Sequence, residues 1–556
     1  MKHRFLSTVV ITMFVFGCKQ PVSPLAEFIP KGAAAVFIVD VNQIKDKVNS
    51  SGITIDSLVD LFSDEETDNA IRWSDITHSG IDLKVPLFIF SDQNNSIQNG
   101  NTANFGLVAQ IENEGKLIDF LKKHNPGAEV KQDSKYKYVE LKDGNVAGWE
   151  NNIFIVSGST NAGAGSDPAR SHQQLTALFT QNESASIASV GEFRDMMKKT
   201  GDIHFWINAS SKMASLGMLG MTKIGSLFQD TYTEGTITFE KGKAKASAET
   251  HYNKTLSDIL SKYPSREIDK TLISRYPDDV NGFAVVAFDP RVLIDILRYL
   301  GFDTMADGYL SEAGFTTTDI VNAFKGDIGV VFSDFRIEEG AIPNMPGIGT
   351  KRPVAQFLLN AVIGDKAAFN RVMNGLVKQR ILTKNGDQYQ LGIFGGHDFV
   401  IEATPDNFFI ASDDALIKAY ESSNNNSALS AEVEKEINGK SMAMYVDMGK
   451  LLDTSRQVAL HDSYYVFSDS GKTWQAAKST FKNFIGYTEK GDGKTTRSAF
   501  ELNTVNQNEN SLASLAKFIA IVHQDWRHPR SVDIHPPLDE DSIQRMPDVP
   551  EPKSSD

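Results

Sequence analysis

The sequence predicts an α+β fold made of two tandem, internally duplicated domains, each a largely antiparallel, curved sheet with helices packed on one face. Three observations carry this prediction. Short apolar segments that are typical of strands alternate along the chain with segments of helical periodicity. Turns such as Lys142–Asn145 and Lys490–Gly493 are typical of hairpins between antiparallel strands. The order of the segments also recurs in the second half of the chain.

The two halves begin in the same way. The run AAAVFIVDV contains Asp40, and the run GFAVVAFDP contains Asp289, which lies 249 positions later (289 minus 40). Both runs are apolar and rich in β-branched or aromatic residues, as buried strands are. A helical pattern follows each run, and Gly52 and Gly301 are again 249 positions apart (301 minus 52). This agreement suggests two copies of one unit.

Further matches keep the same order along the chain. They comprise strands that end at Ser91 and Ser333, strands that begin at Asn151 and Asp406, strands around Trp206 and Tyr445, and turns that begin at Glu240 and Glu489. Two unrelated α+β domains with similar strands are the alternative, but matches in one order favour duplication. We expect the first repeat over residues 25–262 and the second over residues 263–526, with a linker near Ser261–Pro277.

The N-terminus has the pattern of a bacterial export signal. Lys2 and Arg4 precede the apolar run Phe5–Phe16, which is too short for a permanent membrane helix of about 20 residues. Gly17 and Cys18 follow, as in a lipobox, and Cys18 is the only cysteine in the chain. We therefore expect a signal peptide over residues 1–17 and lipidation at Cys18. An ordinary secretory signal with a chance cysteine is the alternative.

Residues 18–24 read as a short, proline-containing tether between the lipid and the first repeat. Lys19, rather than an aspartate, follows the cysteine. By resemblance to lipoprotein sorting in well-studied Gram-negative bacteria, this favours the outer membrane, with the periplasmic or surface face left open.

Composition excludes some partners. The formal net charge is −15, which becomes −17 once Lys2 and Arg4 leave with the signal, so a nucleic-acid partner is not expected. Residues 527–556 are rich in proline and acidic residues and are expected to be a disordered tail. This tail is either a solvated end or a peptide that binds a partner in extended form.

No motif of a known active site is present. The patterns HExxH, GxSxG and paired CxxC are absent, so no catalytic residue, cofactor or metal ligand is assigned. A calcium loop that would begin at Asp92 lacks its closing glutamate, because Ala103 occupies that position. The metal-capable residues near the C-terminus have irregular spacing and are not assigned to a site either: His523, Asp525, His528 and His535.

Local patterns suggest structural roles for other residues. Asp40 and Asp289 each follow a strand and precede a helix, where a carboxylate can cap the helix. A role of either aspartate as a general acid or base would need a second functional group that the fold brings close to it. The Met-rich and Gly-rich segment Met213–Phe228 is interpreted as core packing, with an adaptable binding surface as the alternative. His204 is interpreted as a sheet residue.

The lipobox, the opening FIPKGAAAVFIVDV behind it and the second opening YPDDVNGFAVVAF together resemble the Bacteroidota lipoproteins grouped as domain of unknown function number 4836. The resemblance covers nearly all of residues 24–525 and extends to the short tether and the two-part length. It implies an outer-membrane or periplasmic lipoprotein. It brings no catalytic residues.

Three functions are compatible with these features. The leading hypothesis is a lipid-anchored cell-envelope protein that acts as a non-enzymatic binding or accessory subunit of an outer-membrane assembly. Its partners would be the membrane, through the lipid on Cys18, and a protein of the outer membrane. The first alternative is a carrier of an apolar or glycan ligand that uses the Met-rich segment or Trp73, Trp149 and Trp206. The second is a hydrolase with an unrecognised site.

Overall fold

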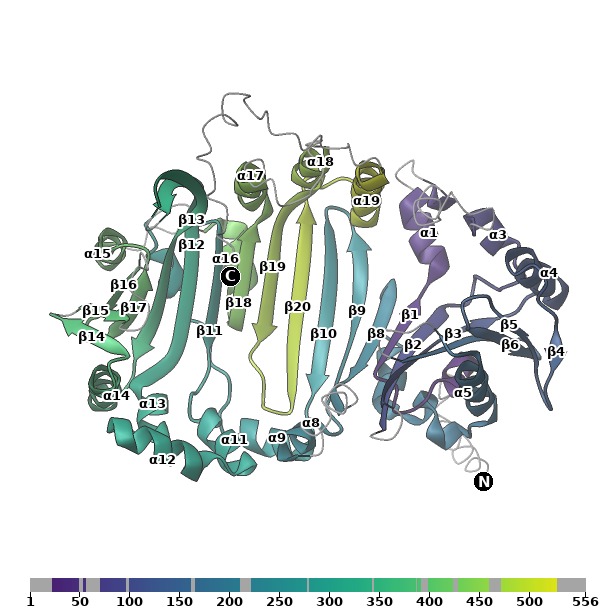
Figure 1. Cartoon of the computed structure of the whole chain (residues 1–556), viewed down its shortest axis with the longest axis horizontal. Coiled ribbons are helices and arrows are strands. Elements are labelled where there is room, and N and C mark those ends of the chain that lie inside the picture. Colours follow the sequence, from purple (N-terminus) through teal and green to yellow (C-terminus); the bar gives the residue numbers. More distant parts are fainter. Residues whose placement is uncertain are drawn as a thin grey trace, which may run out of the picture.

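The computed structural model describes residues 23–49, 54–56, 71–96, 100–161, 166–210, 222–277, 280–342, 345–386, 388–391, 399–423, 429–459 and 472–527. The expected signal peptide, Cys18 and the tail beyond residue 527 therefore lie outside the described residues. The chain is mixed helix and strand, as predicted, with a large antiparallel, open sheet (Figure 1).

The first half of the chain contributes strands that pair in the order β4-β5-β6-β7-β3-β2-β1-β8-β9-β10. They are β1 (Ala35–Val39), β2 (Leu87–Ser96), β3 (Gly100–Gln110), β4 (Lys131–Gln132), β5 (Lys137–Glu140), β6 (Val146–Glu150), β7 (Ile153–Asn161), β8 (Ile203–Asn208), β9 (Tyr232–Glu240) and β10 (Lys243–His251).

The second half contributes strands that pair in the order β14-β15-β16-β17-β13-β12-β11-β18-β19-β20. They are β11 (Gly282–Ala287), β12 (Phe324–Ile342), β13 (Met345–Ile363), β14 (Leu382–Asn385), β15 (Gln388–Leu391), β16 (Val400–Ala403), β17 (Asn407–Ala411), β18 (Lys440–Asp447), β19 (Phe481–Glu489) and β20 (Thr495–Thr504). This order is the same as that of the first half.

The two halves meet at β10 and β20, which pair antiparallel from Lys243 opposite Asn503 to His251 opposite Thr495. Because of this pairing, the strands of the described chain form one sheet of 20 strands. The expectation of one separate sheet per repeat is therefore corrected. Without this pairing, β10 would be an edge strand of the first half and β20 an edge strand of the second. The unpaired backbone N–H and C=O groups of each strand find their partners on the other.

Two hydrophobic cores lie on one face of the sheet, which we call the core face. Val36, Phe90 and Trp206 belong to the first core, which packs against η1 (Pro24–Phe28), η3 (Ile187–Ser189), α5 (Pro168–Thr180) and α6 (Gly191–Met196). Phe283 and Val331 belong to the second core, which packs against α10 (Thr271–Ser274), α15 (Asp414–Ser422) and α16 (Ala431–Ile437). Side chains alternate along the paired strands, and this alternation places both cores on the same face.

Two helices pack on the opposite face, at the outer strands. Leu117 and Leu121 of α4 (Glu114–His124) contact Trp149 and Phe154, and Phe369 of α14 (Lys366–Lys378) belongs to the equivalent cluster in the second half. The expectation of helices on one face only is therefore wrong. The outer strands are apolar on both sides, so each side requires a cover.

The remaining helices lie mainly along the two ends of the strands (Figure 1). The helices α1 (Val41–Asn49), α17 (Met448–Ala459), α18 (Lys472–Thr480) and α19 (Ser511–Arg527) line one end, with α3 (Trp73–Thr77) near α4. The other end is lined by α8 (Lys223–Phe228), α9 (Lys254–Leu260), α11 (Val292–Leu300), α12 (Asp303–Ala313) and α13 (Thr317–Ala323). Among the described helices, none combines the length and the apolar character that crossing a bilayer requires.

The predicted linker near Ser261–Pro277 is not a loose connection. It contains α10, whose Leu272 and Ile273 are buried in the second core. The Gly-rich and Ser-rich segment from Ser157 begins inside β7, which ends at Asn161, whereas residues 162–165 lie outside the described residues. Long-range pairing and packing thus organise residues whose local composition suggests a loop.

Candidate functional site

A cluster of charged side chains lies on the core face, between the two hydrophobic cores. Glu234 is on β9, Glu249 and His251 are on β10, and Arg497 is on β20. Glu249 lies opposite Glu234 on one side and opposite Arg497 on the other. The register of the sheet therefore brings together residues from both halves of the chain. Lys199, from the connection between α6 and β8, completes this charged cluster.

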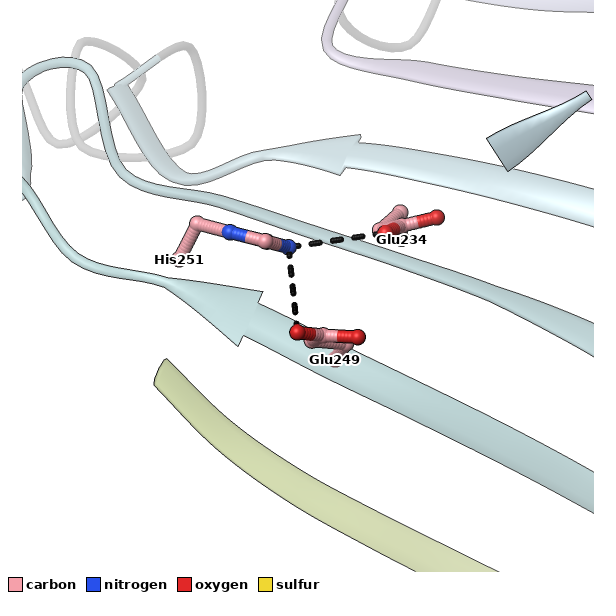
Figure 2. Close-up of side chains that lie close together, drawn as sticks. All are labelled: Glu234, Glu249 and His251. Carbon is pink, nitrogen blue, oxygen red and sulfur yellow. Dashed lines mark ion pairs between the residues drawn. The ribbon is translucent and has the colours of Figure 1, made fainter. Parts of the chain in front are cut away.

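Glu234, Glu249 and His251 point toward one another, as Figure 2 shows. The His251 Nε2 atom is 3.4 Å from Glu234 Oε1 and 3.8 Å from Glu249 Oε1. One candidate ligand atom from each of the three residues lies within 4.8 Å of the others. The arrangement is thus compact enough for the three side chains to share one bound species.

Two cations balance the two carboxylates. The Lys199 Nζ atom is 2.8 Å from Glu234 Oε1 and 3.5 Å from Glu249 Oε2. The Arg497 Nη2 atom donates a hydrogen bond of 2.9 Å to Glu249 Oε1. Burial acts to raise the pKa of Glu249, but the hydrogen bond and charge of Arg497, with the charges of Lys199 and His251, lower this pKa overall. Glu249 is therefore ionised at neutral pH.

An aromatic stack fixes the position of the His251 ring. The ring of Tyr232 stacks on Trp206 at a centroid distance of 4.2 Å and on His251 at 4.7 Å. Burial raises the pKa of the Tyr232 hydroxyl, so this residue remains uncharged. Because Trp206 belongs to the first core, the imidazole is held against a rigid part of the molecule.

A cavity of about 240 Å³ adjoins the cluster. Its lining carries charges of both signs: Lys199, Lys245, Arg497, Glu234, Glu249 and Glu489. Such a lining suits a polar or ionic occupant and does not suit a purely apolar ligand.

The face of the sheet opposite the core face exposes apolar side chains over its central strands, and we call this surface the open face. One row runs across the paired strands through Ile89, Phe37, Phe205, Gly235 and Ala248. The apolar side chains of this face that are more than a third exposed are Phe37, Ile89, Phe105, Phe332, Met442 and Phe500.

Phenylalanine rings of the open face lie over glycines of the neighbouring strands. A Cβ atom added to Gly235 would lie 2.4 Å from Phe205 Cζ, and one added to Gly486 would lie 2.9 Å from Phe500 Cδ1. Phe105 covers Gly158 in the same way. The rings lie flat where glycine leaves room, which makes this part of the sheet a smooth apolar surface.

The residues singled out for a carrier function lie elsewhere. Trp73, Trp149 and Trp206 are all buried, so they form no exposed stacking surface. Most of the Met-rich segment, residues 211–221, lies outside the described residues. Its described end, α8, packs Leu227 against α9 and α11, as the core interpretation predicts.

The capping prediction is confirmed for Asp40, whereas Asp289 forms a tight turn with Arg291 and α11 has no side-chain cap. Asp40 Oδ1 accepts a hydrogen bond of 3.0 Å from the backbone N–H of Gln43 in α1. Asp289 Oδ1 accepts one of 3.0 Å from the backbone N–H of Arg291, just before α11. The hydrogen bond from the Arg291 side chain lowers the pKa of Asp289.

Among the described residues, the other histidines and acidic residues singled out from the sequence do not lie in the charged cluster. His204 lies on β8, as expected, and its Nε2 is 2.8 Å from the carbonyl oxygen of Lys199. Asp92 lies on β2 and His523 on α19, whereas His528 and His535 are outside the described residues. The cluster of Glu234, Glu249 and His251 was not found from the sequence. Its only local signal is the alternation of Glu249 and His251 along one strand face.

The family model described as Domain of unknown function (DUF4836) matches residues 26–469. The chain belongs to this family. No curated protein matches the DUF4836 chain. Parts of it are similar to solved structures of TP0453: crystal form III has a TM-score of 0.25 and 10% identity over 43% of this chain and 85% of that chain. Crystal form I has a TM-score of 0.24 and 12% identity over 42% of this chain and 81% of that chain. Scores this low carry no argument about the fold or the function.

Proposed function

We propose that this DUF4836 chain is a lipid-anchored lipoprotein of a Bacteroidota cell envelope that acts as a non-enzymatic binding subunit of an outer-membrane assembly. The observation that carries the binding role is the open face. Monomeric proteins rarely expose a wide apolar surface, and aromatic and methionine side chains are enriched where proteins bind one another. The signal-like N-terminus and Cys18 support the location.

The position of the anchor favours a protein rather than the bilayer as the occupant of the open face. Five residue steps separate Cys18 from Ser23, and an extended chain spans them in about 18 Å at most. The η1 helix that follows buries Leu25 and Ala26 in the first core, on the core face. A lipid on Cys18 would therefore join the molecule nearer the core face, which would leave the open face for another partner.

Purification from mildly solubilised membranes, with the native lipid in place, tests this proposal. The wild-type protein should recover one partner protein at a fixed ratio. The double variant Phe37→Ser/Phe500→Ser should lose most of this recovery, because it places two hydroxyl groups in the apolar surface. Tyr309→Ser is the matched control, since Tyr309 is an exposed aromatic residue on α12, which lies at the end of the strands (Figure 1).

Recovery of the lone chain from wild-type membranes would contradict the proposal, and so would equal recovery by both variants at equal melting temperatures. Mass spectrometry of the mature protein tests the anchor separately, because a lipidated Cys18 adds the mass of its acyl groups. An unmodified thiol would remove the membrane-anchored part of the proposal.

We also infer that the two halves of the chain arose by duplication. The supporting observation is the shared order of strand pairing, together with the symmetry of the junction. Lys245 lies opposite Glu501 and Glu249 lies opposite Arg497, so a shift of 252 positions exchanges the two pairs (497 minus 245 and 501 minus 249). Superposition of residues 25–262 on residues 263–526 with the strands in this order would test the inference.

The two alternative functions would use other features. A carrier of an apolar or glycan ligand would hold it on the open face, and solvent extraction of the purified protein followed by mass spectrometry would detect it. A hydrolase would use the charged cluster, but Glu249, with its lowered pKa, is unsuited to donate a proton near neutral pH.

A further inference from the structure

We propose that Glu234, Glu249 and His251 form a binding site for a divalent transition-metal ion of the zinc class. The ligand set is one imidazole nitrogen with two carboxylates, which is a combination that Zn²⁺ accepts in proteins, with a water molecule as the fourth ligand. This inference is independent of the proposed binding role of the open face.

The separations of the ligand atoms fit a single ion. Around a tetrahedral ion with bonds of about 2.1 Å, neighbouring ligand atoms are roughly 3.4 Å apart. The His251 Nε2 atom is 3.4 Å from Glu234 Oε1 and 3.8 Å from Glu249 Oε1. The two carboxylate atoms lie within 4.8 Å of each other, so the glutamate side chains would adjust to bring all three ligands to bonding distance.

Two unsatisfied polar atoms point to a missing ligand. Glu234 is only 4% exposed, yet its Oε2 atom is buried with no hydrogen-bond partner among the described atoms. The Nε2 atom of His251 is likewise buried and makes no hydrogen bond there. Buried polar groups are nearly always paired, and an ion is one of the usual partners. A metal ion between these atoms would satisfy the His251 nitrogen and draw the Glu234 carboxylate into coordination.

Lys199 is the cation that a metal ion would displace. Its ammonium group contacts both Glu234 and Glu249 and so neutralises the charges that would otherwise attract the metal. The Lys199 side chain is 41% exposed, and its flexible stem can move toward solvent. Arg497 can remain on Glu249 Oε1, because a carboxylate oxygen has two lone pairs and can accept this hydrogen bond while it binds an ion.

The surroundings of the site are suited to hold a metal ion. The stack of Trp206, Tyr232 and His251 fixes the imidazole ring, which lowers the entropy cost of ligation. The adjoining cavity of about 240 Å³ is lined by both glutamates and has room for a water ligand. The ligands come from adjacent strands of a continuous sheet, so their backbones are held in register.

Titration of the full chain with ZnCl₂ in a calorimeter tests the proposal. All samples carry Cys18→Ser, so that the thiol cannot bind zinc. The parent should bind one Zn²⁺ whose affinity falls about tenfold or more in Glu234→Gln and in His251→Gln. Lys199→Met should bind Zn²⁺ several-fold more tightly than the parent, because the competing ammonium is gone. Tighter binding on loss of Lys199 is a result that a purely structural ion-pair cluster would not give.

Asp133→Asn is the matched control. The Asp133 carboxylate is 3.6 Å from His172 Nε2, which makes a histidine–carboxylate pair without a third ligand among the described residues. Zinc binding should be unchanged in this variant. His251 is partly exposed, so His251→Gln carries the test alone if Glu234→Gln does not fold. Equal zinc affinity in the parent and His251→Gln, or weaker binding in Lys199→Met, would overturn the proposal.

Discussion

The buried carboxylates Asp202, Glu234, Asp319, Asp327 and Glu501 each pair with a cationic side chain. Asp319, at the start of α13, is the best example. Its Oδ1 atom accepts hydrogen bonds of 2.9 and 2.6 Å from the Arg371 guanidinium of α14, and its Oδ2 atom accepts one of 2.9 Å from the Thr316 backbone N–H. The hydrogen bond from Arg371 is the largest of the effects that lower the pKa of Asp319.

Asp319→Asn should lower the free energy of unfolding by about 1–2 kcal/mol at pH 7, because it weakens both the helix cap and the ion pair. The folded pKa of Asp319 is lowered, so the stability it contributes is present above its unfolded pKa of about 3.9. That stability is lost as the pH falls through the folded pKa. The difference in the free energy of unfolding between wild type and variant should therefore shrink below about pH 4.

Denaturation by urea at pH 7 and at pH 3 measures the difference in the free energy of unfolding at each pH. Asp258→Asn is the control, because Asp258 pairs with Lys254 at the surface of α9 and should change stability by less than about 0.5 kcal/mol. An equal difference for Asp319→Asn at both pH values would contradict the prediction.

Contacts between residues that are close in the sequence could be predicted, whereas contacts between distant residues could not. The cap made by Asp40 and the turn made by Asp289 depend on the next two or three residues, so bonds of this kind could be predicted. The cluster of Glu234, Glu249 and His251 depends on the register between β9 and β10 and on the arrival of Lys199 from another connection. Neither the register nor the connection has a local signal in one sequence.

At the scale of elements, side-chain periodicity located most strands, but it did not show which residues must stay small. Gly235 on β9 is such a residue, because an added Cβ atom would meet Ser247 O at 2.1 Å and the Phe205 ring at 2.4 Å. The segment Lys472–Thr480 forms α18, although it follows a glycine and carries no long apolar run. Packing against α19 and α17 decides that helix, and such packing is not visible locally.

Gly235→Ala should destabilise the protein by about 1–3 kcal/mol, because the sheet must shift to admit the methyl group. Gly308→Ala is the opposite case: Gly308 lies inside α12 and an added Cβ atom has no neighbour within 4 Å. It should stabilise the protein by about 0.5–1 kcal/mol through helix propensity. Thermal or urea unfolding of the two variants measures the contrast. Equal effects of the two substitutions would show that the Phe205 ring does not rest on Gly235.

At the scale of the whole molecule, the sequence predicted two repeats but not that their edge strands pair. The junction between the halves consists mainly of the β10–β20 ladder. A hydrophobic cluster also joins the halves, in which Leu256 and Ile259 of α9 pack with Val292 and Ile296 of α11. Edge pairing has no sequence signature beyond the alternation of ordinary strands, because any unprotected edge offers the same backbone groups.

This architecture predicts that the chain can be cut between its halves without separating them. A protease site inserted between Lys262 and Tyr263 lies near the surface, where the Lys262 side chain is 59% exposed. After cleavage, the two fragments should elute together in size-exclusion chromatography, because the β10–β20 ladder remains intact. Ala246→Pro should separate or aggregate the fragments, since Ala246 pairs with Phe500 and Ile237 in the middle of β10. Ala431→Pro, at the first position of α16, is the control that keeps the fragments together. Separation of the cleaved fragments without any proline would mean that β10 and β20 do not hold the two halves in one sheet.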